Sequence, residues 1–273
     1  LYARCHRHPA RERRARILEA RADYAGVVAL CDDIIAAPRC EAEAEAAARL
    51  LGRARRKLYG KTVARRRDQF ARIDLELPRE DGPVELLAAA ALAPQWREVH
   101  WVENALMNAL FGLAFWEQIF TAVPGAFHNP YQSVPTDMYS PEFQERRKEE
   151  LTVRLAQLRE SGPGAALREA YRQYADFQCR WVDWRRINAD LVDAVARVIP
   201  ADHLLAIWER MLFDPRENRR GFPDLIALGD GPGEYCLVEV KGPGDALQES
   251  QKRWLRFFDR QGIPATVAWV SWE

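Results

Sequence analysis

Three ionisable residues stand in an otherwise apolar stretch near the end of the sequence, and their types suit phosphate chemistry. Asp224 follows Pro223 directly, while Glu239 and Lys241 lie two positions apart in a second apolar run. Residues two apart in a strand project from the same face, so Glu239 and Lys241 are expected to point together. Buried carboxylates are costly unless they are paired or bind a metal. Two converging carboxylates suit a hard divalent cation, and a neighbouring lysine can stabilise phosphate charge.

Two short apolar segments must bring these residues together. The runs 225–228 and 235–240 are rich in strand-forming residues and are joined by the turn sequence 229–233. This arrangement predicts a buried hairpin, with Pro223 at the first position of its strand, where proline is tolerated. A Glu-Val-Lys sequence alone is more often an exposed strand edge with an ordinary ion pair. Its combination with Pro-Asp is much more specific.

This combination resembles the PD-(D/E)xK nuclease superfamily, and in particular its VRR-NUC branch. The matching text is Gly221-Phe-Pro-Asp-Leu, Leu237-Val-Glu-Val-Lys-Gly-Pro, Asp245-Ala-Leu and Gln251-Lys-Arg-Trp-Leu. Upstream, residues 103–120 and 127–138 are similar to segments of the Fanconi-associated nucleases. The fold that this resemblance implies is α+β, with a restriction-endonuclease-like mixed sheet.

The resemblance also implies roles for individual residues. Glu103, Asp224, Glu239 and the carbonyl of Val240 would hold one or two Mg²⁺ or Mn²⁺ ions. Lys241 would orient the nucleophile or stabilise the transition state, and Gln132 would lie in the active site. The implied activity is that of a structure-selective 5′-flap endonuclease and 5′→3′ exonuclease, acting on branched or flap DNA in interstrand-crosslink repair.

Two other functions fit the same residues. A helical adaptor with an inactive nuclease-like core would bind branched DNA or repair proteins, but such a chain is expected to have lost part of the carboxylate–lysine set. A Holliday-junction resolvase would act as a dimer, which a long helical insertion would obstruct. We therefore expect a monomeric nuclease, with repair proteins as further partners.

The charge balance limits how this chain can bind DNA. The 40 Lys and Arg residues equal the 40 Asp and Glu residues in number, so binding must rest on local basic patches. Arg216 and Arg219 precede the hairpin and are candidates for contact with the DNA backbone. Lys252 and Arg256 lie one turn apart on a predicted helix and suit either a phosphate contact or a solvated surface. By resemblance, Gln251 belongs with these DNA-binding candidates.

Helical patterns dominate the rest of the chain. Residues 1–83 are expected to form a helical region, tetratricopeptide-like or a plain bundle, that ends in a short strand or connector at 71–83. Residues 84–273 would be the nuclease domain, with a core helix over 98–120 that contains a buried Glu103. A long insertion of three helices is expected at about 140–212. A helix starting at Asp245 and a strand over 264–272 would complete the core.

The arginines of the expected insertion have two interpretations. Arg146, Arg147, Arg185 and Arg186 lie among aromatic residues, so they suit either DNA contact or a solvated surface. Tryptophans at helical spacing are more often core, which we favour for Trp181 and Trp184.

Cysteine usage and hydropathy indicate the compartment. The five cysteines are scattered and lack the spacing of a zinc site or a disulfide framework, which favours a reducing cytoplasm. No apolar run reaches transmembrane length, so no membrane association is expected. In a bacterium the protein would be associated with the nucleoid, and in a eukaryote it would be nuclear. Because the sequence begins with Leu1, we expect it to be a fragment of a longer protein.

Overall fold

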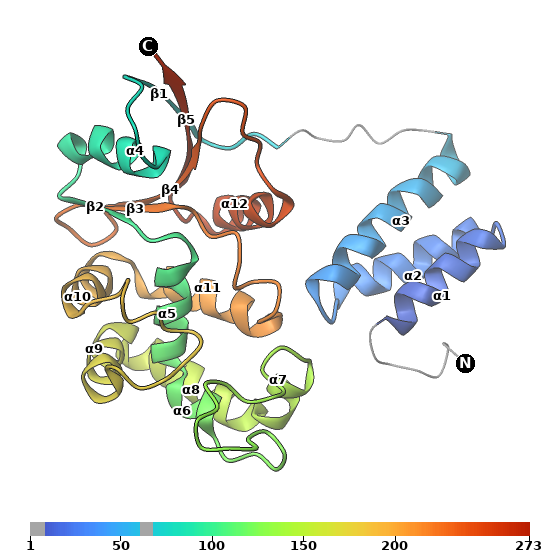
Figure 1. Cartoon of the computed structure of the whole chain (residues 1–273). Coiled ribbons are helices and arrows are strands. Elements are labelled where there is room, and N and C mark those ends of the chain that lie inside the picture. The colour runs from blue at the N-terminus through green and yellow to red at the C-terminus, as the bar shows by residue number, and fades with distance from the viewer. Residues whose placement is uncertain (1–8, 61–67) are drawn as a thin grey trace. The chain divides into compact units, whose positions relative to one another are not determined.

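The structure is a computed structural model that describes residues 9–60 and 68–273. It divides into two compact units at Arg67 and Asp68. The described part of the first unit contains α1 (Ala10–Ala20), α2 (Tyr24–Ala36) and α3 (Glu41–Tyr59), shown in blue in Figure 1. These helices pack on one another through small and aliphatic side chains such as Ala15, Val27 and Ala47. The helical character expected here is confirmed, while the tetratricopeptide-like arrangement stays a prediction.

A five-stranded mixed sheet forms the centre of the second unit. Its strands are β1 (Arg72–Leu77), β2 (Glu98–Trp101), β3 (Leu225–Leu228), β4 (Tyr235–Lys241) and β5 (Ala265–Trp272), in the order β1-β5-β4-β3-β2. β1 and β4 pair in parallel with β5, whereas β3 pairs in antiparallel fashion with β4 and β2. The predicted hairpin is confirmed, with Leu225 opposite Val238.

Two predictions about segment types are wrong. The boundary expected at residue 83 lies at residue 68, because β1 pairs with β5 and thus belongs to the sheet of the second unit. The expected helix over 98–120 is instead a strand, β2, followed by α5 (Glu103–Ala114) and α6 (Trp116–Phe120). β2 pairs with β3, a partner more than a hundred residues later, so its strand character depends on a non-local contact.

Helices cover both faces of the sheet (Figure 1). On one face, α4 (Val84–Leu92) packs its Ala88 and Leu92 against Val238 and Val240. The other face bears Leu237 and meets the largest core cluster, which includes residues of α5 and α12 (Glu249–Gln261). Side chains two apart on β4 thus point to the same face, as the pattern predicts, and Glu239 and Lys241 lie on the face covered by α12.

The segment expected to be an insertion is helical and packs around α5. It contains α7 (Glu142–Arg146), α8 (Lys148–Ser161), α9 (Pro163–Tyr174), α10 (Ala189–Val198) and α11 (Ala201–Phe213), and a short 3₁₀ helix, η2 (Ala93–Gln95), lies earlier in the chain. Trp181 is core, as predicted, and Trp184 packs partly buried against the core. Arg147 is fully buried and pairs with Asp137, so DNA contact is the wrong interpretation for this arginine.

The start of α12 differs from the prediction and matters for the site. The helix begins at Glu249 rather than near Asp245, and Gln248 and Gln251 form its capping box. Gly262 ends it with a positive φ of 68°, as predicted. Asp245 instead accepts a hydrogen bond from the Gly242 amide, which closes the turn after β4.

Four of the five cysteines lie within the described residues. Cys31, Cys179 and Cys236 are free thiols, whereas Cys5 lies outside the described residues. Within residues 9–60 and 68–273, no helix combines the length and the apolarity needed to cross a bilayer.

Candidate active site

Asp224, Glu239 and Lys241 meet at the hairpin, as the sequence predicts. The Lys241 Nζ lies 2.7 Å from Glu239 Oε1, and both side chains are almost fully buried. Asp224 immediately precedes β3 and accepts a 2.8 Å hydrogen bond from the Val240 amide on the neighbouring strand. The antiparallel pairing of β3 with β4 therefore places two carboxylates and one ammonium group side by side.

The electrostatics of these carboxylates fit a site for a cation. Burial raises the pKa of Asp224, although the Val240 amide and the Lys241 ammonium oppose the shift. Burial and the adjacent Asp224 charge raise the pKa of Glu239 to about 8, and the lysine offsets only part of this effect. Glu239 Oε2 is buried and has no hydrogen-bond partner among the described residues. Two adjacent carboxyl groups, one with an unsatisfied oxygen, form a donor set that a divalent cation would satisfy.

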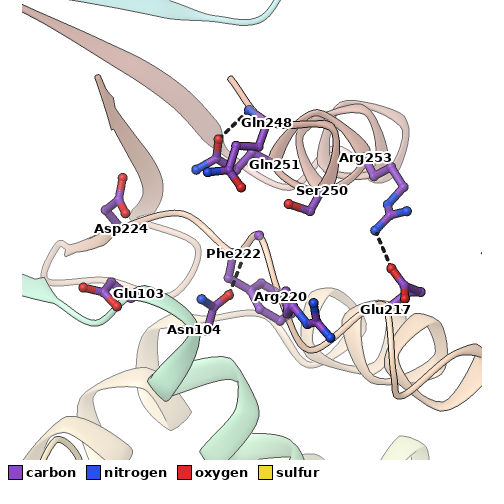
Figure 2. A pocket seen from close by; sticks show the side chains of 11 residues that line it. Glu103, Asn104, Glu217, Arg220, Phe222, Asp224, Gln248, Ser250, Gln251 and Arg253 are labelled. Atoms are coloured by element: carbon purple, nitrogen blue, oxygen red, sulfur yellow. Dashed lines mark hydrogen bonds and ion pairs between the residues drawn. The ribbon is translucent and has the colours of Figure 1, made fainter. Parts of the chain in front are cut away.

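Glu103 stands beside this pair but does not join it. Among the described residues, no group of three His, Cys, Asp or Glu side chains is close enough to hold a metal ion. The Glu103 side chain is 37% exposed rather than buried as expected, and its carboxylate lies 3.3 Å from Arg186. Figure 2 shows the Glu103 and Asp224 side chains pointing in different directions. The expected convergence of three carboxylates is thus reduced to two.

The backbone nevertheless ties Glu103 to the hairpin. The amides of Val102 and Glu103 both donate to the Asp224 carbonyl oxygen at 2.9 Å. Glu103 has a φ of 45°, a left-handed conformation that is uncommon for a residue with a Cβ. Such strain persists only where the surroundings enforce it, and it is frequent at functional sites. Because the backbone of Glu103 is fixed beside Asp224, only a rotation about its side-chain bonds can redirect the Glu103 carboxylate.

A polar pocket opens next to the carboxylates (Figure 2). It lies between the start of α12 and the segment before β3. Besides Glu103 and Asp224, its lining residues are Asn104, Glu217, Arg220, Gly221, Phe222, Gln248, Ser250, Gln251 and Arg253. The N-terminus of α12 and two arginines lie in its wall together with the carboxylates of Glu103, Glu217 and Asp224, so the lining carries both signs of charge.

Two asparagines of α5 hold the segment that leads into Asp224. Asn104 Oδ1 accepts a hydrogen bond from the Phe222 amide, and Asn108 Nδ2 donates to the Arg219 carbonyl. They are one helical turn apart and share a face. On the other side, Trp254 of α12 donates from its indole nitrogen to the Arg220 carbonyl. These positioning contacts were not predicted, although two asparagines at this spacing on an apolar helix were a usable signal.

Gln251 connects the start of α12 with the carboxylate pair. Its Oε1 accepts a hydrogen bond from the Gln248 amide, and its Nε2 donates to Glu239 Oε1 at 2.5 Å. The capping box and the site thus share one side chain. The sequence analysis grouped Gln251 with the DNA-binding candidates, whereas in the structure it contacts Glu239, a candidate metal ligand.

Comparison with known proteins identifies the domain. The family model described as the VRR-NUC domain matches residues 158–272, a range that includes the hairpin, α12 and β5. Residues 158–272 of this chain form a VRR-NUC domain. The match begins inside the segment expected to be an insertion, so α9, α10 and α11 fall within the family's own domain.

The relatives of this VRR-NUC chain are Fanconi-associated nucleases. It is 40% identical over 270 residues to the Fanconi-associated nuclease 1 homolog of Pseudomonas aeruginosa, covering 97% of this chain and 48% of that protein. The zebrafish (Danio rerio) Fanconi-associated nuclease 1 is 30% identical over 174 residues, or 62% of this chain and 18% of that protein. The chain therefore spans at most about half the length of these two relatives.

A solved structure agrees over the whole chain. The crystal structure of paFAN1 bound to 2nt 5′flap DNA with gap has a TM-score of 0.79 and 38% sequence identity. The match covers 100% of this chain and 50% of that protein. The α+β class predicted from the sequence is confirmed.

Gln132, a family-derived active-site candidate, makes its contacts elsewhere. Its Nε2 donates to the carbonyls of Ala126 and Val134, and its Oε1 accepts from the His128 amide. All three hydrogen bonds close the loop between α6 and α7, and no contact joins this side chain to Asp224 or Glu239 in the described structure. In this VRR-NUC chain Gln132 thus stabilises its own loop.

The basic candidates are spread around the site and are already engaged. Arg216 donates to the Tyr139 carbonyl, and the Arg219 guanidinium lies 4.9 Å from the centre of the Tyr139 ring. Lys252 pairs with Glu249 on the same helix, and Arg256 binds Asp68 through two hydrogen bonds. Their role in DNA binding stays a prediction, because exposed pairs of this kind exchange readily for phosphate.

Proposed function

We propose that this chain is the catalytic part of a divalent-metal-dependent, structure-selective DNA nuclease. The observation that carries the proposal is the meeting of Asp224, Glu239 and Lys241 next to a pocket lined by both carboxylates and arginines. A buried carboxylate oxygen that lacks a hydrogen-bond partner among the described residues has little structural value, since an unsatisfied buried polar atom is destabilising. Its presence is accounted for if a cation binds there.

The protein groups have distinct roles in this proposal. Asp224, Glu239, the Val240 carbonyl and a rotated Glu103 would hold one or two Mg²⁺ or Mn²⁺ ions, which supply Lewis-acid activation of water and neutralise phosphate charge. Lys241, held by Glu239, presents a compact positive charge to the attacking oxygen or to the phosphate. Gln251 keeps Glu239 oriented through its 2.5 Å hydrogen bond. Such fixed charges stabilise a transition state without reorganising during the reaction.

The substrate class follows from the relatives. Their names describe Fanconi-associated nucleases, and the solved structures similar to this chain hold 5′-flap DNA with a gap. We therefore assign this chain 5′-flap endonuclease and 5′→3′ exonuclease activity, acting on branched DNA in interstrand-crosslink repair. Within a cell this work would place the protein with the chromosomal DNA, in contact with other repair proteins.

The test is cleavage of fluorescent flap, splayed-arm and four-way-junction DNA with Mg²⁺, with Mn²⁺ or with EDTA. We expect metal-dependent cleavage of the 5′ flap. Asp224→Asn and Lys241→Met should each lower the rate by at least about 10²–10³-fold, the size of effect that a transition-state electrostatic group commonly has. DNA affinity measured by fluorescence anisotropy should change little, because neither side chain lies on the exposed surface.

Each alternative has its own signature in the same assay. An inactive adaptor would bind branched DNA and cut none of it under any metal condition. A junction resolvase would prefer the four-way junction over the flap. If Asp224→Asn or Lys241→Met still cuts at the wild-type rate, the proposed site is wrong. Lys148→Met serves as a control, because it removes an exposed ammonium group at the start of α8, outside the residues that line the pocket.

A further inference from the structure

Arg186 is the residue that forms an ion pair with the Glu103 carboxylate. Its guanidinium lies 3.3 Å from Glu103 Oε2 and over the Trp101 ring, 5.5 Å from the ring centre. Arg186 belongs to the connection between α9 and α10, far along the chain from Glu103. Three elements thus meet here: the end of β2, the start of α5 and this connection.

The backbone and the side chain of Glu103 have different partners. The Glu103 amide is fixed to the carbonyl of Asp224, so the backbone is already next to the proposed cation site. Only the side chain turns aside, and the cation on that side is Arg186. The ion pair is a single long contact between two side chains that are each about one-third exposed. A pair of this kind is weak and exchanges readily.

We propose that Arg186 acts as a counterion that holds Glu103 away from the metal site until a divalent cation displaces it. This inference rests on the proposed function, because it assumes that Asp224 and Glu239 bind the cation. In the arginine-paired state the site has two carboxylates. Rotation of Glu103 about its side-chain bonds adds the third and leaves the guanidinium stacked on Trp101, at the rim beside Glu103. Arg186 is thus a positioning residue that acts through Glu103.

The proposal predicts that Arg186 lowers the affinity of the protein for metal. Removing it spares the metal the cost of breaking an ion pair, so Arg186→Met should bind Mn²⁺ more tightly than the wild type. An ion pair between side chains that are each about one-third exposed sets the size of this change at about two- to fivefold in Kd. Methionine keeps much of the length and the apolar contact with Trp101, so it removes mainly the charge.

The experiment is isothermal titration calorimetry of the whole chain with MnCl₂ at constant ionic strength, without DNA. Arg185→Met is the matched control, because it removes the same charge one residue away, from a side chain that is 90% exposed and paired with Asp183. We expect the wild-type Kd for Arg185→Met and an intermediate or wild-type Kd for Arg186→Lys, which restores the positive charge.

A double variant separates the ion pair from general electrostatics. In a Glu103→Gln background the arginine has no carboxylate to hold, so adding Arg186→Met should leave the Mn²⁺ affinity unchanged. The proposal is overturned if Arg186→Met binds Mn²⁺ no more tightly than the wild type, or if it gains the same factor in the Glu103→Gln background. Failure of the proposed function gives a different result. In that case the wild type either does not bind Mn²⁺ or binds it equally well after the Asp224→Asn substitution.

Discussion

At the scale of single residues, the site depends on side chains that each satisfy two structural requirements. Gln251 caps α12 with its carbonyl oxygen and steadies Glu239 with its amide nitrogen. Asp224 accepts from the Val240 amide through its carboxylate, while its backbone oxygen holds the start of α5. Because one residue serves both the fold and the site, the positions of the reactive groups are fixed by the same contacts that stabilise the hairpin and the two helices.

Gly221 allows α12 to approach the segment before Asp224. Its φ is +83°, and a Cβ built on it would lie 2.6 Å from the backbone carbon of Ser250, which is closer than atoms can pack. We expect Gly221→Ala to displace the start of α12, and with it Gln251, from Glu239. The free energy of unfolding should fall by about 1–3 kcal/mol for the clash, in addition to about 1 kcal/mol for the left-handed backbone. Urea denaturation and the flap assay measure the two consequences.

The control for this substitution is Gly244→Ala. Gly244 has a similar φ of +88°, but a Cβ there would meet nothing within 4 Å. The control therefore carries the backbone cost without the clash, and it should retain flap cleavage. Equal losses of stability for the two variants would show that the close approach to Ser250 is unimportant.

At the scale of elements, α5 holds the segment before the hairpin through two side-chain hydrogen bonds, one in which α5 accepts and one in which it donates. Asn104 must accept, since its partner is the Phe222 amide, whereas Asn108 must donate, since its partner is the Arg219 carbonyl. An aspartate can only accept when ionised. We therefore expect Asn104→Asp to be tolerated, and Asn108→Asp to lower the free energy of unfolding by about 1–3 kcal/mol, the cost of an unsatisfied buried group.

Thermal unfolding of the two aspartate variants tests this directional argument. The negative charge is the same in both, so a difference between them reports the direction of the hydrogen bond. Asn104→Ala and Asn108→Ala should both be destabilising, because each loses its partner. If Asn108→Asp is as stable as Asn104→Asp, α5 does not hold the segment in the way described.

A comparison of the predicted with the observed helices and strands shows which parts of the fold could be predicted from the sequence. The hairpin was predicted correctly because its two short apolar runs and its glycine-rich turn are local signals. β2 was mistaken for helix because Val99 and Val102 fit the spacing of the helix that follows, while its true partner, β3, is remote in the chain. The start of α12 was misplaced by four residues because two glutamine-containing capping patterns overlap at Asp245–Gln251.

The candidate site was predictable to a similar extent. Asp224, Glu239 and Lys241 were found because one hairpin holds all three. The orientation of Glu103 was not predictable, because its partner Arg186 lies 83 residues away. Gln132 was assigned by family resemblance alone, and its loop contacts are a property of the folded chain. Local pattern thus identifies the reactive residues, whereas the ion pairs that orient them are tertiary.

At the scale of the whole molecule, β1 decides where the second unit begins. This strand lies at the edge of the sheet, and its Ile73, Leu75 and Leu77 pack with the cluster beneath α4. Just before it, Asp68 forms two hydrogen bonds with Arg256 of α12. The second unit therefore includes residues 68–83, which the sequence analysis assigned to the end of the helical region.

A truncation series tests this boundary. We expect a chain of residues 68–273 to fold, because these residues form one compact unit. Its midpoint of thermal unfolding should equal that of the second unit in the whole chain. A chain of residues 84–273 lacks β1, so it exposes the edge of β5 and loses three partly buried apolar side chains. The loss should lower the free energy of unfolding by roughly 2–5 kcal/mol and favour association through the free edge.

Circular dichroism melts and gel filtration report these two effects, and Leu75→Asp in the 68–273 chain separates them. That variant keeps the strand backbone available for pairing with β5 but places a charge where Leu75 is half-buried. It should lose stability while remaining monomeric, whereas the 84–273 chain should lose stability and also associate. A stable, monomeric 84–273 chain would mean that β1 is dispensable and that the second unit begins at α4. The proposed site, which is connected to β1 through β4 and β5, would then be held by the other four strands and the helices without β1.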